Sequence, residues 1–569
     1  MAQTSHSSPA NEAGQPHRRP HQGRNRWLLA IAVVVSVFVL ALAITAEYLA
    51  RHAGPILRSS VVATLTARFH SPVELDSLDV SVARGLQVRG RGLRILYLAG
   101  PTQPGMAQKQ GLPAPPMVSV DDFTFRTTLH DLLHLRANLA RVDIDGMELH
   151  IPPHSGGHIL HLPPPKTRIT LTAAKIYCKN VTLVIDTTKP GKIPLQFDIQ
   201  NLELTDVGVS QPMLYVADVI NPKPLGDVHA SGHFGPWRGD DPRATPLDGQ
   251  YTFEHVDLSS IKGLGGTLSS TGQFEGHLGH INIDGTTSTP NFSLDVSGHP
   301  VPLETKFHAF VDGTTGDTTL APVEATLLRS QFTAQGIITN LRDHDHDIAL
   351  TVDMPHGRIE DLLKLGMKTD PPVMRGAVAL HAKLHIPPGS VHVTQKMQLS
   401  GNFRIQNVEF TSARLQDQVD SLSLRAQGKP EEAKTAASDH QPRVASEMTV
   451  TFSLANATML IPSLAYQIPG AKVNLDGVYS LDGSAFEFRG QVRTAATASQ
   501  MVTGWKSVLL TPFDALFKKN GAGLQLPISI SGTNGDVKFG LAMHGVEETP
   551  EQIESDIKAQ RQAQTASPR

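Results

Sequence analysis

Residues 263–285 read GLGGTLSSTGQFEGHLGHINIDG, and this stretch carries the pattern that decides the fold. Leu268, Phe274, Ile281 and Ile283 lie among polar residues at the two-residue period of a strand with one buried face. The glycines could also suggest a phosphate-binding loop, but no helix pattern follows them and no Lys-Ser or Lys-Thr pair completes such a loop. The stretch therefore predicts antiparallel hairpins with glycine corners.

The same alternation recurs along most of the chain and predicts a mainly β protein. We expect an N-terminal transmembrane helix, then an elongated, curved antiparallel β-sheet, groove-like or sandwich, with a few short amphipathic helices. Some 30 short strands are expected, among them those at residues 73–75, 78–82, 86–88, 93–97, 118–125, 139–151 (with a hairpin turn at Asp145-Gly146), 169–171, 181–185, 195–199, 202–204, 247–253, 292–296, 306–311, 323–327, 331–338, 374–386, 397–409, 421–427, 447–454, 457–461, 471–479, 485–492, 526–531 and 536–543.

Helix patterns are few, at residues 55–69, 359–365 and 495–519. In the first, Leu57, Val61, Leu65 and Phe69 form one stripe at four-residue spacing. Three helices cannot cover one face of so many strands. The sheet must therefore fold on itself or leave an apolar trough for a ligand.

An uncharged, proline-free stretch precedes the strands: residues 27–46 read WLLAIAVVVSVFVLALAITA. About 20 apolar residues span the hydrocarbon core of a bilayer, and Trp27 and Tyr48 stand where aromatic rings favour the membrane interface. Arginines at positions 18, 19, 24 and 26 predict a cytoplasmic N-terminus and a chain otherwise across the membrane. The alternative is a cleaved signal peptide, with Ala41-Leu42-Ala43 as its cleavage site.

Composition excludes some classes of function. The formal net charge is −3, whereas nucleic-acid-binding proteins usually carry a basic excess. Cys178 is the single cysteine, so no disulfide can form within the chain. We expect no nucleic-acid partner.

Two clusters resemble metal sites. His150, His154, His158 and His161 are separated by prolines and glycines that prevent a helix from aligning them, and no cysteine or carboxylate cluster completes a zinc set. In the stretch 343–347, DHDHD, strand alternation would send histidines and aspartates to opposite faces. Motifs of hydrolases, metalloproteases and nucleotide-binding enzymes are absent from the sequence. We therefore expect no enzyme activity, metal or cofactor.

The predicted organisation has six parts. Residues 1–26 form a disordered cytoplasmic tail and 27–48 the anchor. Two β regions, 55–211 and 247–545, are separated by a Pro-rich, irregular linker at 212–246. The second β region carries a flexible insertion at 429–443, and residues 546–569 form a polar tail.

Three features together resemble the AsmA-like family of bacterial envelope proteins, which includes TamB-type bridge-like lipid transport proteins. The first is an anchor that leads into a short helix. The second is Arg68-Phe-His-Ser-Pro-Val-Glu-Leu-Asp-Ser-Leu-Asp-Val80, continued by Gly85-Leu-Gln-Val-Arg and Gly92-Leu-Arg-Ile95. The third is the set of strand-turn units Gly266-Thr-Leu, Gly272-Gln-Phe-Glu-Gly-His-Leu278, Asn291-Phe-Ser-Leu294 and Asp312-Gly-Thr-Thr-Gly-Asp317.

The resemblance covers about residues 27–545 and implies an inner-membrane, periplasmic protein without catalytic residues. It further implies a greasy β groove, phospholipid transport or outer-membrane biogenesis, and outer-membrane or other envelope proteins as partners. The residues expected to line the groove are Leu268, Phe274, Ile281, Ile283, Phe292, Leu294 and Val296. Two alternatives remain. One is a closed, dry sheet that assists assembly of outer-membrane proteins through its edges. The other is a polysaccharide-active enzyme with two carboxylates across a cleft.

Overall fold

A computed structural model describes most of the segment from residue 72 to residue 541. The described residues are 36–38, 40–41, 58–59, 61–63, 65–66, 72–81, 86–96, 116–127, 138–151, 172–187, 192, 194–207, 211–222, 224–236, 238, 242–341, 346–436, 444–502, 523–533 and 536–541.

One continuous sheet of 25 strands dominates the protein, as the sequence predicts. The strands are β1 (Val73–Ser81), β2 (Leu86–Ile95), β3 (Val118–Thr127), β4 (Asn138–Leu139), β5 (Val142–Ile151), β6 (Thr172–Ile185), β7 (Leu195–Val207), β8 (Met213–Pro222), β9 (Leu225–Phe234), β10 (Pro246–Asp257), β11 (Leu264–Gly265), β12 (Thr267–His277), β13 (His280–Leu294), β14 (Val301–Val311), β15 (Thr318–Leu327), β16 (Ser330–Asn340), β17 (His346–Arg358), β18 (Met374–Ile386), β19 (Gln398–Phe410), β20 (Glu447–Ala455), β21 (Thr458–Ile468), β22 (Ala471–Ser480), β23 (Phe486–Thr494), β24 (Leu524–Thr533) and β25 (Asp536–Leu541).

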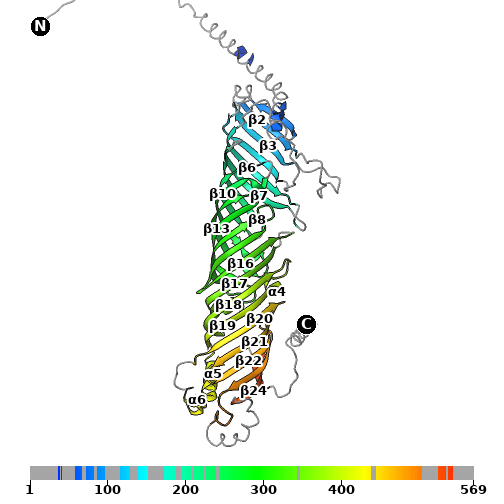
Figure 1. Cartoon of the computed structure of the whole chain (residues 1–569). Helices are drawn as coiled ribbons and strands as arrows, with labels where there is room; N and C mark the ends of the chain where they lie inside the picture. The colour runs from blue at the N-terminus through cyan, green and yellow to red at the C-terminus, as the bar shows by residue number, and fades with distance from the viewer. Residues whose placement is uncertain are drawn as a thin grey trace, which may run out of the picture.

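Neighbouring strands of the sheet are almost all consecutive in the chain and antiparallel. The exceptions are β4 and β5, which pair in succession with β6 in parallel, and the two-residue β11, which pairs with the end of β13. Figure 1 shows the result, an elongated half-barrel in which tilted strands follow one another from the N-terminal end to the C-terminal end.

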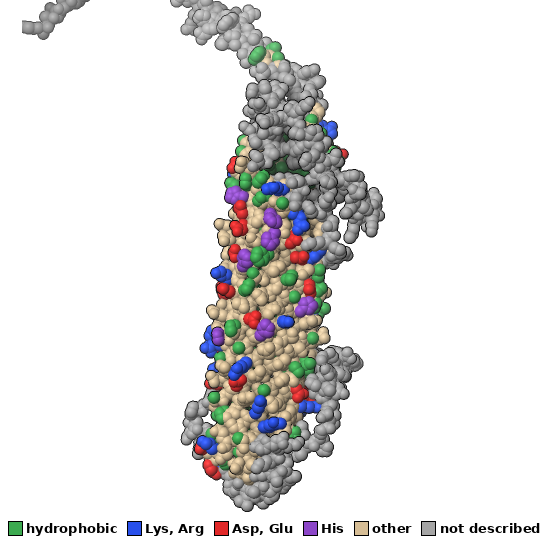
Figure 2. All heavy atoms as spheres, in the orientation of Figure 1, with side chains coloured by type: hydrophobic (Ala, Val, Ile, Leu, Met, Phe, Trp, Pro, Cys, Tyr) green, Lys and Arg blue, Asp and Glu red, His purple; other side chains and the backbone are tan. Residues whose placement is uncertain are grey.

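Strand alternation gives this sheet two different faces. Cross-strand pairing joins one row of polar residues on the outer face, from Arg91 in β2 through Asp218 and Lys306 to Asn402 in β19. Figure 2 shows the outer surface, where charged side chains and histidines are interspersed and apolar side chains are scattered. The apolar residues of the same strands face the concave side, which we call the inner face.

Helices are few among the described residues: α3 (Ile359–Gly366), α4 (Val393–Lys396), α5 (Ala413–Ala426) and α6 (Pro430–Ala436), besides two single 3-10 turns, η2 (Pro242–Ala244) and η3 (Leu258–Ser260). The described residues between 58 and 66 are also helical, as predicted, and Val61 and Val62 pack against β1 to β3. Within the described part of the chain, we find no helix with the length and apolar character needed to cross a membrane. Most of the predicted anchor, with Trp27 and Tyr48, lies outside the described residues.

Several predictions of local structure are wrong. The segment 212–246 is not an irregular linker but contains β8 and β9, because its six prolines stand at strand ends or between strands and leave both strand interiors free. Asp145 and Gly146 do not turn a hairpin. They lie inside β5, where Gly146 adopts a positive φ of 69°.

The third error concerns residues 421–427, which belong to helix α5 and not to a strand. The side-chain oxygen of Ser412 caps this helix by accepting from the Leu415 N–H, and Val419 and Leu422 pack against the main core. Alternating Leu422, Leu424 and Ala426 fit a strand as well as a helix, which explains the error. Part of the expected flexible insertion 429–443 is likewise the helix α6. Residues 495–502 of the predicted third helix form bends and turns instead, and residues 503–519 lie outside the described residues.

Candidate functional site

The predicted groove residues lie together on two neighbouring strands. Leu268 and Phe274 are on β12; Ile281, Ile283, Phe292 and Leu294 are on β13; Val296 lies in the turn that follows. Phe274 pairs directly with Ile283, and Phe292 pairs with Val301 of β14 after a bulge. All seven side chains are half-buried.

These residues belong to a longer apolar lining. The inner-facing positions of β8 to β16 carry no charged side chain. Most of their large apolar and aromatic residues remain half-exposed although they face the concave side, while Val256, Val301 and Leu327 are buried. The lining includes Tyr215, Val228, Phe253, Leu268, Phe274, Ile281, Ile283, Leu303, Phe307, Leu320, Phe332 and Ile338. We call this lined part of the inner face the trough.

Glycines on the inner face accommodate aromatic rings of nearby strands. A Cβ on Gly285 would lie 2.7 Å from both Phe307 Cζ and the Tyr251 hydroxyl, and one on Gly249 would lie 2.9 Å from Phe274 Cζ. The rings therefore lie along the wall over the glycines and do not project across the trough. Glycine at these positions allows the aromatic rings to approach the backbone closely, so the wall stays thin.

Hydroxyl groups in the trough bond to each other or to the wall. Thr287 and Thr305 share a hydrogen bond of 2.7 Å between their Oγ1 atoms. Ser270 donates to the Thr286 carbonyl at 3.0 Å and lies 3.1 Å from the Tyr251 hydroxyl. Burial raises the pKa of Tyr251, so its hydroxyl stays protonated at neutral pH. The lining thus offers apolar surface and few free hydrogen-bonding groups.

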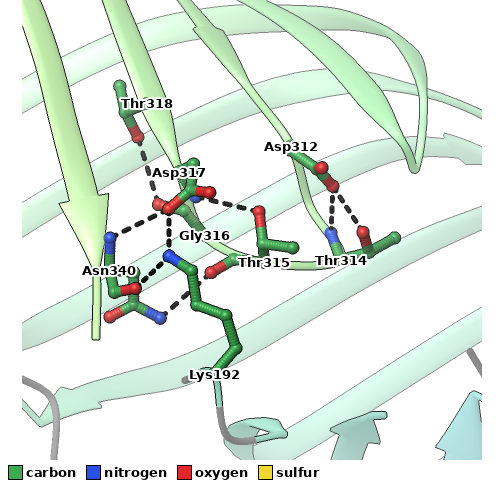
Figure 3. A network of polar contacts seen from close by, with 8 residues as sticks. All are labelled: Lys192, Asp312, Thr314, Thr315, Gly316, Asp317, Thr318 and Asn340. Atoms are coloured by element: carbon green, nitrogen blue, oxygen red, sulfur yellow. Dashed lines mark hydrogen bonds and ion pairs between the residues drawn. The ribbon is translucent and has the colours of Figure 1, made fainter. Parts of the chain in front are cut away.

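The two rims of the curled sheet meet at a first bridge, formed by Lys192. This residue lies in the connection between β6 and β7, yet its ammonium donates to Asp317 Oδ1 at 2.5 Å and to the Asn340 carbonyl, which lie on the opposite rim (Figure 3). The Lys192 side chain is only 10% exposed. Asp317 Oδ1 also accepts from the Asn340 N–H at 3.0 Å, so the carboxylate fixes the end of β16 as well.

A second bridge joins the rims further along the sheet. Asp295, just after β13, accepts from the Thr394 hydroxyl at 2.8 Å and lies 2.6 Å from His392 Nδ1. Both partners lie in the connection between β18 and β19. The Val393 N–H in the same connection donates to the Lys262 carbonyl at 2.9 Å. The two bridges hold segments about a hundred or more residues apart across the open side of the half-barrel.

The outer face carries a depression of about 890 Å³ between β13 and β19, whose lining also includes the inward positions Phe332, Met354 and Leu380. Its side chains include Lys306, Glu324, Asp353, His381 and Arg404, which occupy outward positions of their strands. Asp353 contacts His381 at 2.5 Å and Arg404 contacts Glu447 at 2.7 Å. Because Asp353, His381 and Arg404 already have partners and the charges are exposed, the depression is a weaker candidate for a ligand site than the trough.

The histidine and aspartate residues that resemble metal sites in the sequence do not come together in the structure. His150 lies 2.8 Å from Glu148 and 3.8 Å from Asp186, while His154, His158 and His161 fall outside the described residues. Asp347 contacts His385 of the neighbouring strand β18. Among the residues that the structure describes, no group of three or more His, Cys, Asp or Glu side chains is placed to hold a metal ion. Burial raises the pKa of the Cys178 thiol to about 12, so this cysteine stays protonated.

Sequence reasoning missed Lys192, Asp317 and Asn340 as partners, because no local pattern announces contacts across 125 and 148 residues. It also missed Phe197, an apolar residue of β7 beside the trough, whose exposed fraction is 38%. Comparisons with protein-family models, curated proteins and solved structures found no match.

Proposed function

We propose that this protein is a non-enzymatic, inner-membrane-anchored periplasmic protein that binds the acyl chains of phospholipids in the trough. In this proposal it contributes to lipid transport and outer-membrane biogenesis, as the resemblance to the AsmA-like family implies. The observation that carries the proposal is the uncharged, half-exposed apolar lining of β8 to β16. An apolar surface of this extent in water favours a ligand that covers it.

The chemistry of the lining favours acyl chains over an extended polypeptide. A polypeptide would bring peptide N–H and C=O groups into the trough, and each group buried without a partner costs free energy. The wall has few groups to offer, because its backbone is paired in the sheet ladder and its hydroxyls bond to one another. An acyl chain has no hydrogen-bonding groups that need partners in the wall. The lack of inner charges leaves a phosphate headgroup outside the lining.

Location at the membrane rests on the sequence. The stretch 27–46 has the length and apolarity of a bilayer span, and the arginines before it favour a cytoplasmic N-terminus. A C-terminal alkaline phosphatase fusion tests this orientation. Phosphatase activity in membranes that withstand a carbonate wash supports it. An inactive fusion contradicts it, and release of a form cut after Ala43 favours the signal peptide.

Lipid binding is tested by narrowing the trough without charging it. The variant Gly285→Val places a side chain where Phe307 and the Tyr251 hydroxyl now lie, and both rings must move into the trough. Its control is Thr286→Val, which introduces the same residue one position along, on the exposed outer face. Native mass spectrometry of the detergent-extracted full-length protein should show bound phospholipid in the parent and in the control, and several-fold less in Gly285→Val.

A parent protein that carries no phospholipid would contradict the proposal. In that case the function is better sought at the free strands of the sheet, where a precursor of an outer-membrane protein could add a strand. Equal lipid content in all three proteins would instead move the ligand away from the Gly285 region of the trough.

A further inference from the structure

The N-terminal end of the sheet is packed. Leu75, Leu78, Val88, Val120 and Phe123 form a buried cluster on β1 to β3, and the helical residues Val61 and Val62 lie against it. The Arg58 guanidinium donates to the Leu75 carbonyl at 2.8 Å and so ties the helical segment to β1. At this end, helix and sheet together fill the inner face.

The C-terminal part of the sheet is also packed. A cluster of 14 buried residues runs from Met354 on β17 to Ala471 on β22. Helices α3 and α5 contribute Ile359 and Ala426 to this cluster, and the Ser423 hydroxyl of α5 donates to the Pro469 carbonyl at 2.8 Å. Inner-facing residues such as Ile405, at 1% exposed, have no surface left for a ligand.

Between these ends, the inner side chains of β8 to β16 do not fill the half-barrel. Among the described residues, which cover this segment almost completely, the buried apolar residues form no cluster of their own: Leu278 joins a small cluster with Ile151 and Ile185, and Phe332 packs against the C-terminal cluster. The Lys192 bridge and the Asp295 bridge cross the open side of this same part. The trough is therefore limited at both ends by packed side chains and at two points along its side.

We propose that the trough is a closed-ended chamber that holds a small, fixed number of acyl chains, and that it is not a conduit along the whole length of the sheet. This inference rests on the proposed function, since it names the extent and capacity of the same site. Lipid must then enter and leave through the side of the half-barrel, because both ends are filled by side chains. The protein takes up single lipids and releases them; a continuous file of lipids does not pass from one end to the other.

The dimensions of the chamber determine how many phospholipids it can hold. Eight strands, β8 to β10 and β12 to β16, extend about 34 Å across the strand direction at about 4.8 Å per strand. A bilayer hydrocarbon core of about 30 Å is two acyl chains deep, so the chamber spans about two acyl-chain lengths. We therefore expect one or two phospholipids per protein.

Photocrosslinking at phenylalanine positions of the full-length protein tests the extent of the chamber. The residue p-benzoylphenylalanine replaces Phe274 or Phe307 in the chamber, Phe403 in the C-terminal cluster, and Phe310, whose ring lies on the outer face against His308. After irradiation in membranes, we expect lipid adducts at Phe274 and Phe307 at least five times more often than at Phe403 or Phe310. Native mass spectrometry of the unsubstituted protein should show one or two bound phospholipids.

Two results overturn the chamber while leaving lipid binding intact. One is an equal adduct yield at Phe403 and Phe307. The other is a ladder of many bound lipids on the unsubstituted protein, a count that does not depend on how any variant folds. A protein without lipid and without adducts at Phe274 and Phe307 overturns both the chamber and the proposed function.

Discussion

The inner face of the sheet is hollow between β8 and β16 and packed between β17 and β22, although the strands of both parts alternate in the same way. Ile283 in the hollow part follows Asn282 and precedes Asp284; Ile405 in the packed part lies between Arg404 and Gln406. Ile405 is 1% exposed, whereas Ile283 is half-exposed.

The difference comes from what lies opposite each residue. Helices α3 and α5 cover one rim of the packed part and contribute Ile359 and Ala426 to its core. In the hollow part α4 and α3 reach only the rim, where Thr394 bonds to Asp295 and the Lys364 carbonyl lies near His299, and aromatic rings lie over glycines along the wall. Apolar alternation thus establishes that a face is sheltered, while the covering elements determine whether that face becomes a core or a binding surface.

A single charge should separate the two parts most strongly. Ile405→Asp buries an unpaired carboxylate in a packed core, which costs several kcal/mol, so the C-terminal part should unfold. Ile283→Asp places the carboxylate in the open chamber, where water can reach it, and the sheet should survive without lipid. Circular dichroism and lipid extraction on the same preparations check both. Unfolding of Ile283→Asp together with Ile405→Asp would mean that the trough is a dry core.

Truncation of the same two residues should give the next largest contrast. Ile405→Ala leaves a cavity in a packed core and should lower the free energy of unfolding by about 2–5 kcal/mol. Ile283→Ala removes a side chain that is already partly hydrated and should cost about 1 kcal/mol. Denaturant unfolding of delipidated protein measures both, since bound lipid would add its own stabilisation. Similar losses at the two positions would contradict the division into hollow and packed parts.

The Lys192 bridge predicts a smaller effect, confined to the side of the hollow part. Lys192→Met removes a nearly buried ammonium from Asp317 and the Asn340 carbonyl, and should cost about 1–3 kcal/mol. The control is Lys175→Met: Lys175 contacts Glu203 at 2.6 Å but is 46% exposed, so its loss should change stability much less. Thermal melting measures stability, and lipid exchange between labelled vesicles measures access to the chamber. Equal losses, with unchanged exchange, would exclude a closing role for this bridge.

Much of the sheet could be predicted from the sequence, because the two-residue period is local. The hairpin of β12 and β13 and the strands β18 and β19 follow directly from it, and the helix α3 follows from the equally local helical period. The strands β8 and β9 could not, because the prolines that end them read as an irregular segment until their places at the strand ends are known.

The candidate site could be predicted only in part. Four of the expected residues, Leu268, Phe274, Ile281 and Ile283, share the inner face because alternation fixes which side each residue takes. The limits of the chamber depend on contacts between segments far apart in sequence, such as Lys192 with Asp317. Whether a sheltered residue meets another side chain or empty space is likewise a property of the curled sheet. The sequence of a single strand therefore predicts neither the limits of the chamber nor what a sheltered residue meets.

The smallest predicted effect concerns the outer face, where His385 of β18 reaches Asp347 at the start of β17. His385 Nε2 lies 2.8 Å from Asp347 Oδ1, and Nδ1 lies 3.4 Å from Gln398 Oε1. The hydrogen bond to Asp347 raises the pKa of His385 above 6.5, and Gln398 adds to the shift. A raised pKa in the folded state stabilises the protein below the pKa of the unfolded chain, and this gain is lost as pH rises through the folded pKa. Removing the imidazole should therefore cost more at pH 5.5 than at pH 8.5. Since both side chains are more than a third exposed, the difference should stay under about 1 kcal/mol.

Melting of His385→Gln at the two pH values measures this difference, and Asp347→Asn with the double variant isolates the contribution of the pair. A loss that is larger at pH 8.5, or equal losses at both, would show that the contact carries no charge-dependent stability.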